Sequence, residues 1–259
     1  MSIRKLASLS LFGALVGAST GANAYLIDDF LTPAADQVIN LRHLQNGTAH
    51  TANDVASSAV GGFRDLYLYS PNVSFDASTT LSAGHSGRLS LSNEPDVYAT
   101  GQVFWNGAFV SNPAAPDHTG LGARDLTTNT SNPLLHNATG FYLDLNYLDP
   151  GVDLTLTVWS NGGNISASNH IHNNDLVDTS TNTGTPYRFF SFSDFTGGSV
   201  DFTQVSAIGF TISGPAEYFL WANSLDTRPN PLLVPEPATL ALAGAGLVGM
   251  GGFRRRAKK

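Results

Sequence analysis

The alternation of apolar and polar residues between positions 141 and 159 is the feature that most constrains the fold of this chain. Apolar residues occupy every second position from Phe141 to Tyr147 and again from Val152 to Val158, with an Asp-Pro-Gly sequence at 149–151 between the two runs. A period of two is typical of strands that bury one face and expose the other. The pattern therefore predicts two antiparallel strands joined as a β-hairpin.

The register of this hairpin follows from the requirement that opposed residues share a face, because a slip of one residue moves every side chain to the other face. A three-residue loop fails this requirement, whereas loops of two or four residues meet it. We prefer the four-residue loop at 149–152. The pairs that it predicts on the polar face are Tyr142 with Trp159, Asp144 with Thr157, and Asn146 with Thr155.

Shorter stretches with the same period recur between Gly, Pro, Asn and Asp residues, and no stretch of the central region has a helical stripe. They lie at 26–30, 63–70, 88–92, 97–105, 187–192, 205–213 and 218–225. Roughly nine or ten strands in one body predict an all-β domain, an antiparallel β-sandwich. We expect a jelly roll as the specific arrangement.

The N-terminus has the three parts of a secretory signal. Arg4 and Lys5 precede an apolar run at 6–16, and Ala22 and Ala24 form an A-x-A cleavage sequence. The apolar run is too short to span a bilayer. We therefore expect signal peptidase to remove residues 1–24 during export.

The C-terminus carries a second signal. Pro235, Glu236 and Pro237 precede an uncharged run at 238–253, which is at the short limit for a transmembrane helix. Two prolines so close together keep the chain out of a helix at that point. A basic cytoplasmic tail at 254–259 ends the chain and would stop transfer, through Arg254, Arg255, Arg256, Lys258 and Lys259.

This order of motif, apolar span and basic end resembles the PEP-CTERM sorting signal of Gram-negative bacteria. The resemblance implies recognition of Pro235-Glu236-Pro237 by exosortase, a membrane cysteine protease that removes the anchor. It also implies a surface or matrix protein, held transiently in the inner membrane, in a setting of exopolysaccharide and biofilm. An ordinary single-pass anchor is the alternative. The remaining chain divides into a domain at 25–226 and a Pro-rich linker at 227–237.

The charge of the exported body limits the classes of partner that it can bind. Residues 25–234 contain six Arg, no Lys and 19 acidic residues. An acidic body argues against nucleic acid and anionic lipid as partners. The chain has no Cys, which excludes cysteine nucleophiles and Cys-ligated zinc.

Three segments resemble the first and closing strands of galactose-binding-like jelly rolls, a superfamily that includes many carbohydrate-binding modules. The segments are Leu26–Phe30, Arg188–Phe195 and Asp201–Phe210. The resemblance implies a structural Ca²⁺ near the first strand, with Asp28 and Asp29 as oxygen ligands. The chain departs from the pattern at Asn223, where those modules often have Asp. A polar strand end without metal is the alternative.

Two further charged groups have a structural and a functional interpretation. Arg64 and Asp65 are adjacent, and we expect an internal ion pair there rather than a ligand site. His170 and His172 would share a strand face and could bind a metal, although loop histidines are the preferred interpretation.

The polar face of the predicted hairpin is the candidate glycan-binding surface. Aromatic rings stack on the apolar faces of sugars, while amide and carboxylate groups bind hydroxyls. A solvated outer face is the alternative. We expect a non-catalytic structural or adhesive body in an exopolysaccharide layer. A carbohydrate-binding module and a secreted hydrolase are the other hypotheses, although the sequence has no G-x-S-x-G nucleophile elbow.

Overall fold

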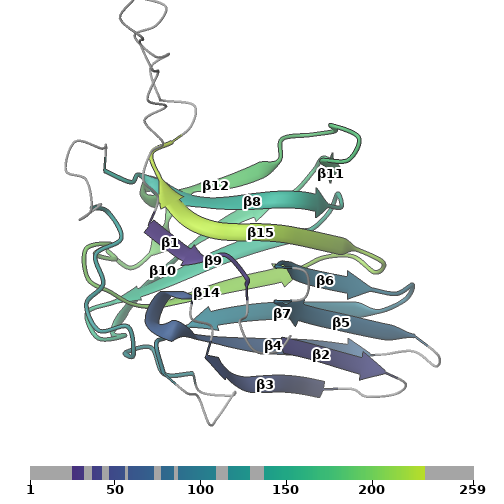
Figure 1. Ribbon diagram of the computed structural model, residues 1–259, viewed down its shortest axis with the longest axis horizontal. Helices are drawn as coiled ribbons and strands as arrows, with labels where there is room; N and C mark the ends of the chain where they lie inside the picture. Colours follow the sequence, from purple (N-terminus) through teal and green to yellow (C-terminus); the bar gives the residue numbers. More distant parts are fainter. Residues whose placement is uncertain are drawn as a thin grey trace, which may run out of the picture.

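The computed structural model describes residues 25–31, 37–42, 47–55, 58–72, 77–84, 87–108, 116–128 and 137–230. Within these ranges the chain forms two antiparallel sheets that pack face to face, and no α-helix occurs (Figure 1). The predicted antiparallel β-sandwich is therefore confirmed. Two short 3-10 turns complete the regular structure, at Val60–Gly62 and Phe192–Asp194.

The larger sheet has eight strands. They are β1 (Tyr25–Asp28), β2 (Gln37–Arg42), β5 (Ser78–Ala83), β6 (Leu89–Asn93), β8 (Gly140–Leu148), β11 (Val177–Asp178), β12 (Tyr187–Ser191) and β15 (Phe219–Arg228). The order is β11-β8-β15-β6-β5-β2, with β12 paired to β8 and β1 paired to β15. β15 ends at Arg228, so it includes the first two residues that the sequence assigned to the linker.

The smaller sheet has seven strands. They are β3 (Gly47–Val55), β4 (Phe63–Asn72), β7 (Tyr98–Trp105), β9 (Asp153–Ser160), β10 (Ile165–His172), β13 (Thr196–Gly197) and β14 (Val205–Ser213). The order is β13-β10-β9-β14-β7-β4-β3. The chain crosses repeatedly from one sheet to the other, as it does between β4 and β5, β7 and β8, and β14 and β15. Such crossings are the connections of a jelly roll.

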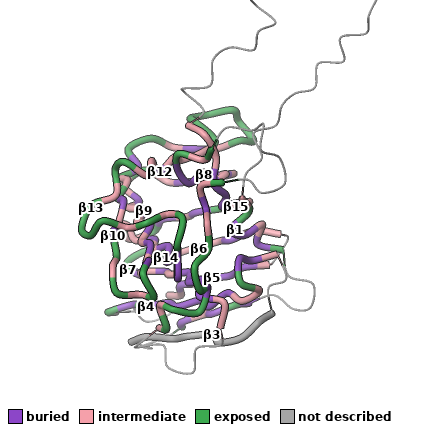
Figure 2. Tube along the Cα trace, turned by 90° about the vertical axis from the view of Figure 1, so that its left-hand side faces the viewer, coloured by how far each residue is buried: buried purple, intermediate pink, exposed green. Residues whose placement is uncertain are grey.

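The core lies between the two sheets, where the buried positions of the strands gather (Figure 2). The apolar residues that alternate with polar ones in the sequence fill this core. Leu143 and Leu145 enter it from β8, and Leu154 and Leu156 enter it from β9, all with no exposed surface. Each such side chain contributes about 1.5–3 kcal/mol of hydrophobic free energy. The alternating side chains of β8 and β9 are thus the inner walls of the sandwich.

The predicted hairpin between these two strands is wrong. β8 belongs to the larger sheet and pairs with β15, β12 and β11, whereas β9 belongs to the smaller sheet and pairs with β10 and β14. The turn at 149–152 therefore crosses between the sheets. Because the core accepts an apolar face from either side, the crossing satisfies the same alternation as a hairpin would.

Two irregularities in the pairing of β8 with β15 change the outer face. Trp221 lies opposite Tyr147 and Ala222 lies opposite Leu145, so Asn146 is an additional residue of β8. Asn223 is an additional residue of β15 in the same way. A bulge of this kind redirects the side chains that follow it. Tyr147, which the alternation placed in the core, therefore lies on the outer face beside Trp221.

Candidate functional site

A hollow of about 450 Å³ opens on the outer face of the larger sheet, where β8, β15 and β6 are neighbours. We call it the Trp221 hollow. Its lining combines aromatic, amide, hydroxyl and charged side chains from β8 and β15, from the residue before β6, and from the end of β11 and the turn after it. The lining residues are Arg88, Asn146, Tyr147, Asp178, Thr179, Ser180, Phe219 and Trp221.

Three aromatic rings form the apolar part of this hollow. Phe219 and Trp221 occupy alternate positions of β15 and so point to the same face. Their ring centroids are 4.8 Å apart, and the Tyr147 ring lies 5.6 Å from Phe219. Trp221 is 37% exposed. Its indole ring therefore offers an apolar surface that a ligand can reach.

Asp149 fixes the Tyr147 ring against β15. Its carboxylate accepts a hydrogen bond from the Tyr147 hydroxyl at 2.9 Å and another from the Phe219 backbone N–H at 2.8 Å. The hydrogen bond to Asp149 is the main cause that raises the pKa of Tyr147. The phenol therefore stays neutral, and its ring is held in place without any ligand.

Beside the aromatic rings runs a chain of hydrogen bonds from Thr179 through Asn146 and Asn223 to Asp144. We call this chain the polar ladder. The Thr179 hydroxyl donates to Asn146 Oδ1 at 3.1 Å. Asn146 Nδ2 donates to Asn223 Oδ1 at 2.9 Å, and Asn223 Nδ2 donates to Asp144 Oδ2 at 3.2 Å. Both amides belong to the bulges. Each amide nitrogen has a second N–H that no described residue accepts, so the ladder can donate to a ligand.

The turn after β11 forms one rim of the hollow. The Thr179 backbone N–H donates to the Asn146 carbonyl at 3.0 Å, which fastens the turn to β8. Asp178 Oδ1 accepts from the backbone N–H and the hydroxyl of Ser180, at 2.9 and 2.6 Å. These hydrogen bonds lower the pKa of Asp178, so the carboxylate is ionised at neutral pH.

The structure brings together only part of the predicted glycan-binding face. Asp144 and Asn146 lie on the polar ladder. Tyr142 shares their face, but its ring stacks on Tyr187 at 4.8 Å, and the Arg228 guanidinium lies 4.1 Å from its centroid. Tyr187 and Arg228 come from β12 and β15, on either side of β8. Tyr142 is therefore in contact with a neighbour on each side, and it is not among the residues that line the Trp221 hollow.

The other half of the predicted face lies on the opposite sheet. Thr155, Thr157 and Trp159 point outward from β9, and Thr157 exchanges a hydrogen bond with Ser168 at 2.8 Å. The His118 ring stacks on Trp159 at 4.4 Å. The predicted pairing of Tyr142 with Trp159 is therefore wrong, because a sandwich places the two outer faces on opposite sides of the molecule.

Four residues of the hollow were not predicted from the sequence: Arg88, Tyr147, Phe219 and Trp221. One signal could have revealed two of them. The run Phe219-Leu220-Trp221-Ala222 is apolar on both faces. In a half-exposed strand one of these faces has to lie outward, and the smaller residues Leu220 and Ala222 are the buried ones.

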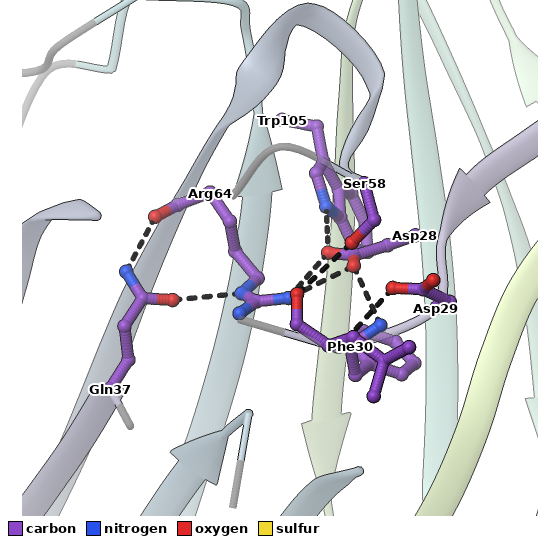
Figure 3. A network of polar contacts seen from close by, with 8 residues as sticks. Asp28, Asp29, Phe30, Gln37, Ser58, Arg64 and Trp105 are labelled. Carbon is purple, nitrogen blue, oxygen red and sulfur yellow. Dashed lines mark hydrogen bonds and ion pairs between the residues drawn. The ribbon is translucent and has the colours of Figure 1, made fainter. Parts of the chain in front are cut away.

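The predicted calcium ligands have other partners (Figure 3). Asp28 is fully buried, and both of its oxygens accept from Arg64 Nη1, at 2.9 and 2.8 Å. It also accepts from Trp105 Nε1 at 2.8 Å and from the Phe30 backbone N–H at 2.7 Å. Asp29 Oδ1 accepts from the Leu31 N–H. Calcium at this place remains a prediction, and these contacts lend it no support.

The prediction of an ion pair between Arg64 and Asp65 is wrong, because the two side chains lie on opposite faces of β4. Adjacent residues of a strand point to opposite faces. Arg64 points into the sandwich and meets Asp28, while Asp65 lies on the outer side of β4. Burial raises the pKa of Asp65 to about 7.

The two histidines share a face of β10, as the sequence suggested. Both contact Asp153 Oδ1, His170 through Nε2 at 3.1 Å and His172 through Nδ1 at 2.7 Å. In the part of the chain that the structure describes, no group of three or more His, Asp or Glu side chains is arranged to hold a metal ion.

The predicted processing signals lie outside the described residues. This holds for Ala22 and Ala24, for Pro235, Glu236 and Pro237, and for the basic tail. Among the described residues, no helix is long and apolar enough to cross a membrane.

Comparison with known proteins identifies one of these signals. Residues 233–256 match the model of the PEP-CTERM protein-sorting motif. No curated protein matches the chain. The prediction that the C-terminus carries a PEP-CTERM sorting signal is therefore confirmed.

Three solved structures illustrate the proteins that the fold is similar to. The family 11 carbohydrate-binding module of a cellulosomal cellulase of Clostridium thermocellum has 11% identity and a TM-score of 0.35, over 81% of this chain and 96% of that one. TmCBM61, solved with β-1,4-galactotriose, has 9% identity and a TM-score of 0.32, over 80% and 99%. The agarase AgWH50C has 13% identity and a TM-score of 0.34, over 80% and 26%. The chain thus consists of an antiparallel β-sandwich followed by a PEP-CTERM protein-sorting motif.

Proposed function

We propose that this protein is exported, sorted by exosortase through its C-terminal motif, and attached to extracellular polysaccharide by the Trp221 hollow. The role is adhesive and not catalytic. The observation that carries the proposal is the exposed Trp221 ring beside the polar ladder. An aromatic platform next to fixed hydrogen-bonding groups suits a sugar, which has an apolar ring face and a rim of hydroxyls.

The rigidity of the hollow supports binding. Asp149 holds Tyr147, and the polar ladder holds both amides, so little side-chain freedom is lost when a ligand arrives. Pre-organised groups bind more tightly because the entropy of ordering them is not lost again on binding.

The position of the hollow relative to the chain ends also supports an adhesive role. Tyr25 of β1 pairs with Thr227, so the domain begins and ends at the same end of β15 (Figure 1). Trp221 lies six residues earlier on that strand, or about 20 Å away at 3.3 Å per residue. The sorting motif follows the end of β15. A body tethered by this motif would therefore present the hollow away from the tether.

The small number of carboxyl groups in the hollow favours binding over hydrolysis. Glycoside hydrolysis generally uses two carboxyl groups on either side of the scissile bond. Asp178 is the one carboxylate among the described residues that line the hollow, and Ser180 already occupies its Oδ1.

Native affinity electrophoresis of the full chain in mild detergent tests the proposal. The gels contain neutral and acidic polysaccharides. Trp221→Ala is compared with Trp159→Ala, which removes the same side chain from the outer face of the other sheet. We expect retardation of the wild type and of Trp159→Ala, and its loss in Trp221→Ala. Retardation that is lost only in Trp159→Ala would place the site on the other sheet, and no retardation on any gel would refute the proposal.

A further inference from the structure

The Trp221 hollow contains a cation, Arg88, that forms no ion pair with any residue the structure describes. The Arg88 guanidinium carbon lies 5.1 Å from the centroid of the Trp221 ring, a cation–π contact. Within the described ranges no carboxylate, carbonyl or hydroxyl accepts a hydrogen bond from this guanidinium. By contrast, Arg64 is paired with Asp28 and Arg228 with Asp226.

The backbone places Arg88 at the hollow. Ser90 of β6 lies opposite Trp221, and Arg88 stands two residues earlier, so its side chain shares the outer face. The Gly84 N–H donates to the Arg88 carbonyl at 3.1 Å, which closes the turn between β5 and β6. The contact with Trp221 places the guanidinium over the indole ring, and a guanidinium in such a contact can still donate hydrogen bonds through its N–H groups.

We propose that the Trp221 hollow binds a uronic acid residue of an acidic polysaccharide, with its carboxylate on Arg88 and its ring on Trp221. The inference rests on the proposed function and names its ligand class. A guanidinium forms paired hydrogen bonds with a carboxylate in one plane, and such charge-assisted bonds are about twice as strong as neutral ones. The polar ladder is left to bind the hydroxyls of the same sugar.

The carboxylates around the hollow are occupied by the protein's own donors. Asp178 is held by Ser180, Asp149 by Tyr147 and Phe219, and Asp144 by Asn223. The acidic body repels an acidic polymer over long range, but the Debye length is about 8 Å at physiological ionic strength. Repulsion from acidic residues farther away than this is therefore screened at about 0.15 M salt, while the direct contact with Arg88 persists. Asp178 lines the same hollow and is ionised, so its repulsion is not screened in this way and opposes the contact with Arg88.

Two forms of one polymer test the inference. Polygalacturonate and its fully methyl-esterified form share the same sugar backbone, and only the first carries carboxylates. We expect the full chain at about 0.15 M NaCl to bind the acid form about tenfold more tightly than the ester, the scale of one hydrogen bond to a charged group.

Three variants test whether the preference for the acid form depends on the charge and shape of the Arg88 side chain. Arg88→Gln is expected to abolish the preference for the acid form. Arg124→Gln, which removes an equal charge at an exposed position near β14, is expected to keep it. Arg88→Lys is expected to restore only part of the preference, since it keeps the charge and loses the planar fork.

The outcomes distinguish this inference from the proposed function. Equal affinity for both polymer forms, or a preference that survives in Arg88→Gln, overturns the acidic ligand. If Trp221→Ala still abolishes binding in that case, the proposed function stands. Failure of every polysaccharide to bind overturns both.

Discussion

Replacing Asp28 by asparagine should destabilise the protein strongly while changing its shape very little. The side chains of Asp28 and Arg64 are both fully buried and lie 2.8 Å apart. Asp28 accepts four hydrogen bonds, from Arg64, Trp105 and Phe30. Burial raises the pKa of Asp28, and the Arg64 charge and these hydrogen bonds oppose the rise. The asparagine variant leaves the Arg64 charge buried without a counterion.

The expected loss follows from that uncompensated charge. Breaking a buried ion pair by removing one partner costs about 3–5 kcal/mol. A domain of this size loses about 2–4 °C of melting temperature per kcal/mol. Asp28→Asn should therefore lower Tm by roughly 6–20 °C. Against a typical total stability of about 5–15 kcal/mol, this is a large fraction.

Thermal unfolding followed by near-UV circular dichroism is a suitable assay, because Trp105 donates directly to Asp28. Asp29→Asn is the matched control, since Asp29 accepts one local hydrogen bond from Leu31. We expect it to change stability by about 0.5–1 kcal/mol.

A double-mutant cycle tests whether the pair acts as a unit. Arg64→Met removes the charge and keeps an apolar side chain in the core. The double variant with Asp28→Asn should lose less stability than the sum of the two single variants, by at least about 1 kcal/mol. Additive losses, or an Asp28→Asn protein as stable as the Asp29→Asn control, would refute the reasoning.

Three further predictions concern other buried positions. Burial raises the pKa of Asp65 from 3.8 to about 7 in the folded state, so the free energy of unfolding should fall as pH rises from about 4 to 7. Melting curves across this range should show a smaller fall for Asp65→Asn. Tyr218→Phe removes a buried hydroxyl that donates to the Ala99 carbonyl at 2.9 Å, and urea unfolding should show a loss of about 1–3 kcal/mol. Gly101→Val should cost about 1–3 kcal/mol in the same assay, because a Cβ there would lie 2.9 Å from a methyl group of Leu91.

Part of the site could be predicted because it depends on local pattern. The alternation placed Asp144 and Asn146 on an outer face, and both belong to the polar ladder. The aromatic partner could not be predicted in the same way. Trp221 reaches these residues through the pairing of β15 with β8, which joins positions 77 residues apart, as in the bond from Asn146 to Asn223.

The sequence by itself determined the C-terminal sorting signal, the all-β class, and which residues of β9, and of β8 up to Leu145, face the core. Only the tertiary structure decided that these strands lie in different sheets, that bulges turn Tyr147 outward, and that Arg64 pairs with Asp28. The physical reason is that side-chain alternation records burial, which is local, whereas strand partners and register are chosen by the packing of the whole sandwich. Any pairing that buries the same faces satisfies the same alternation.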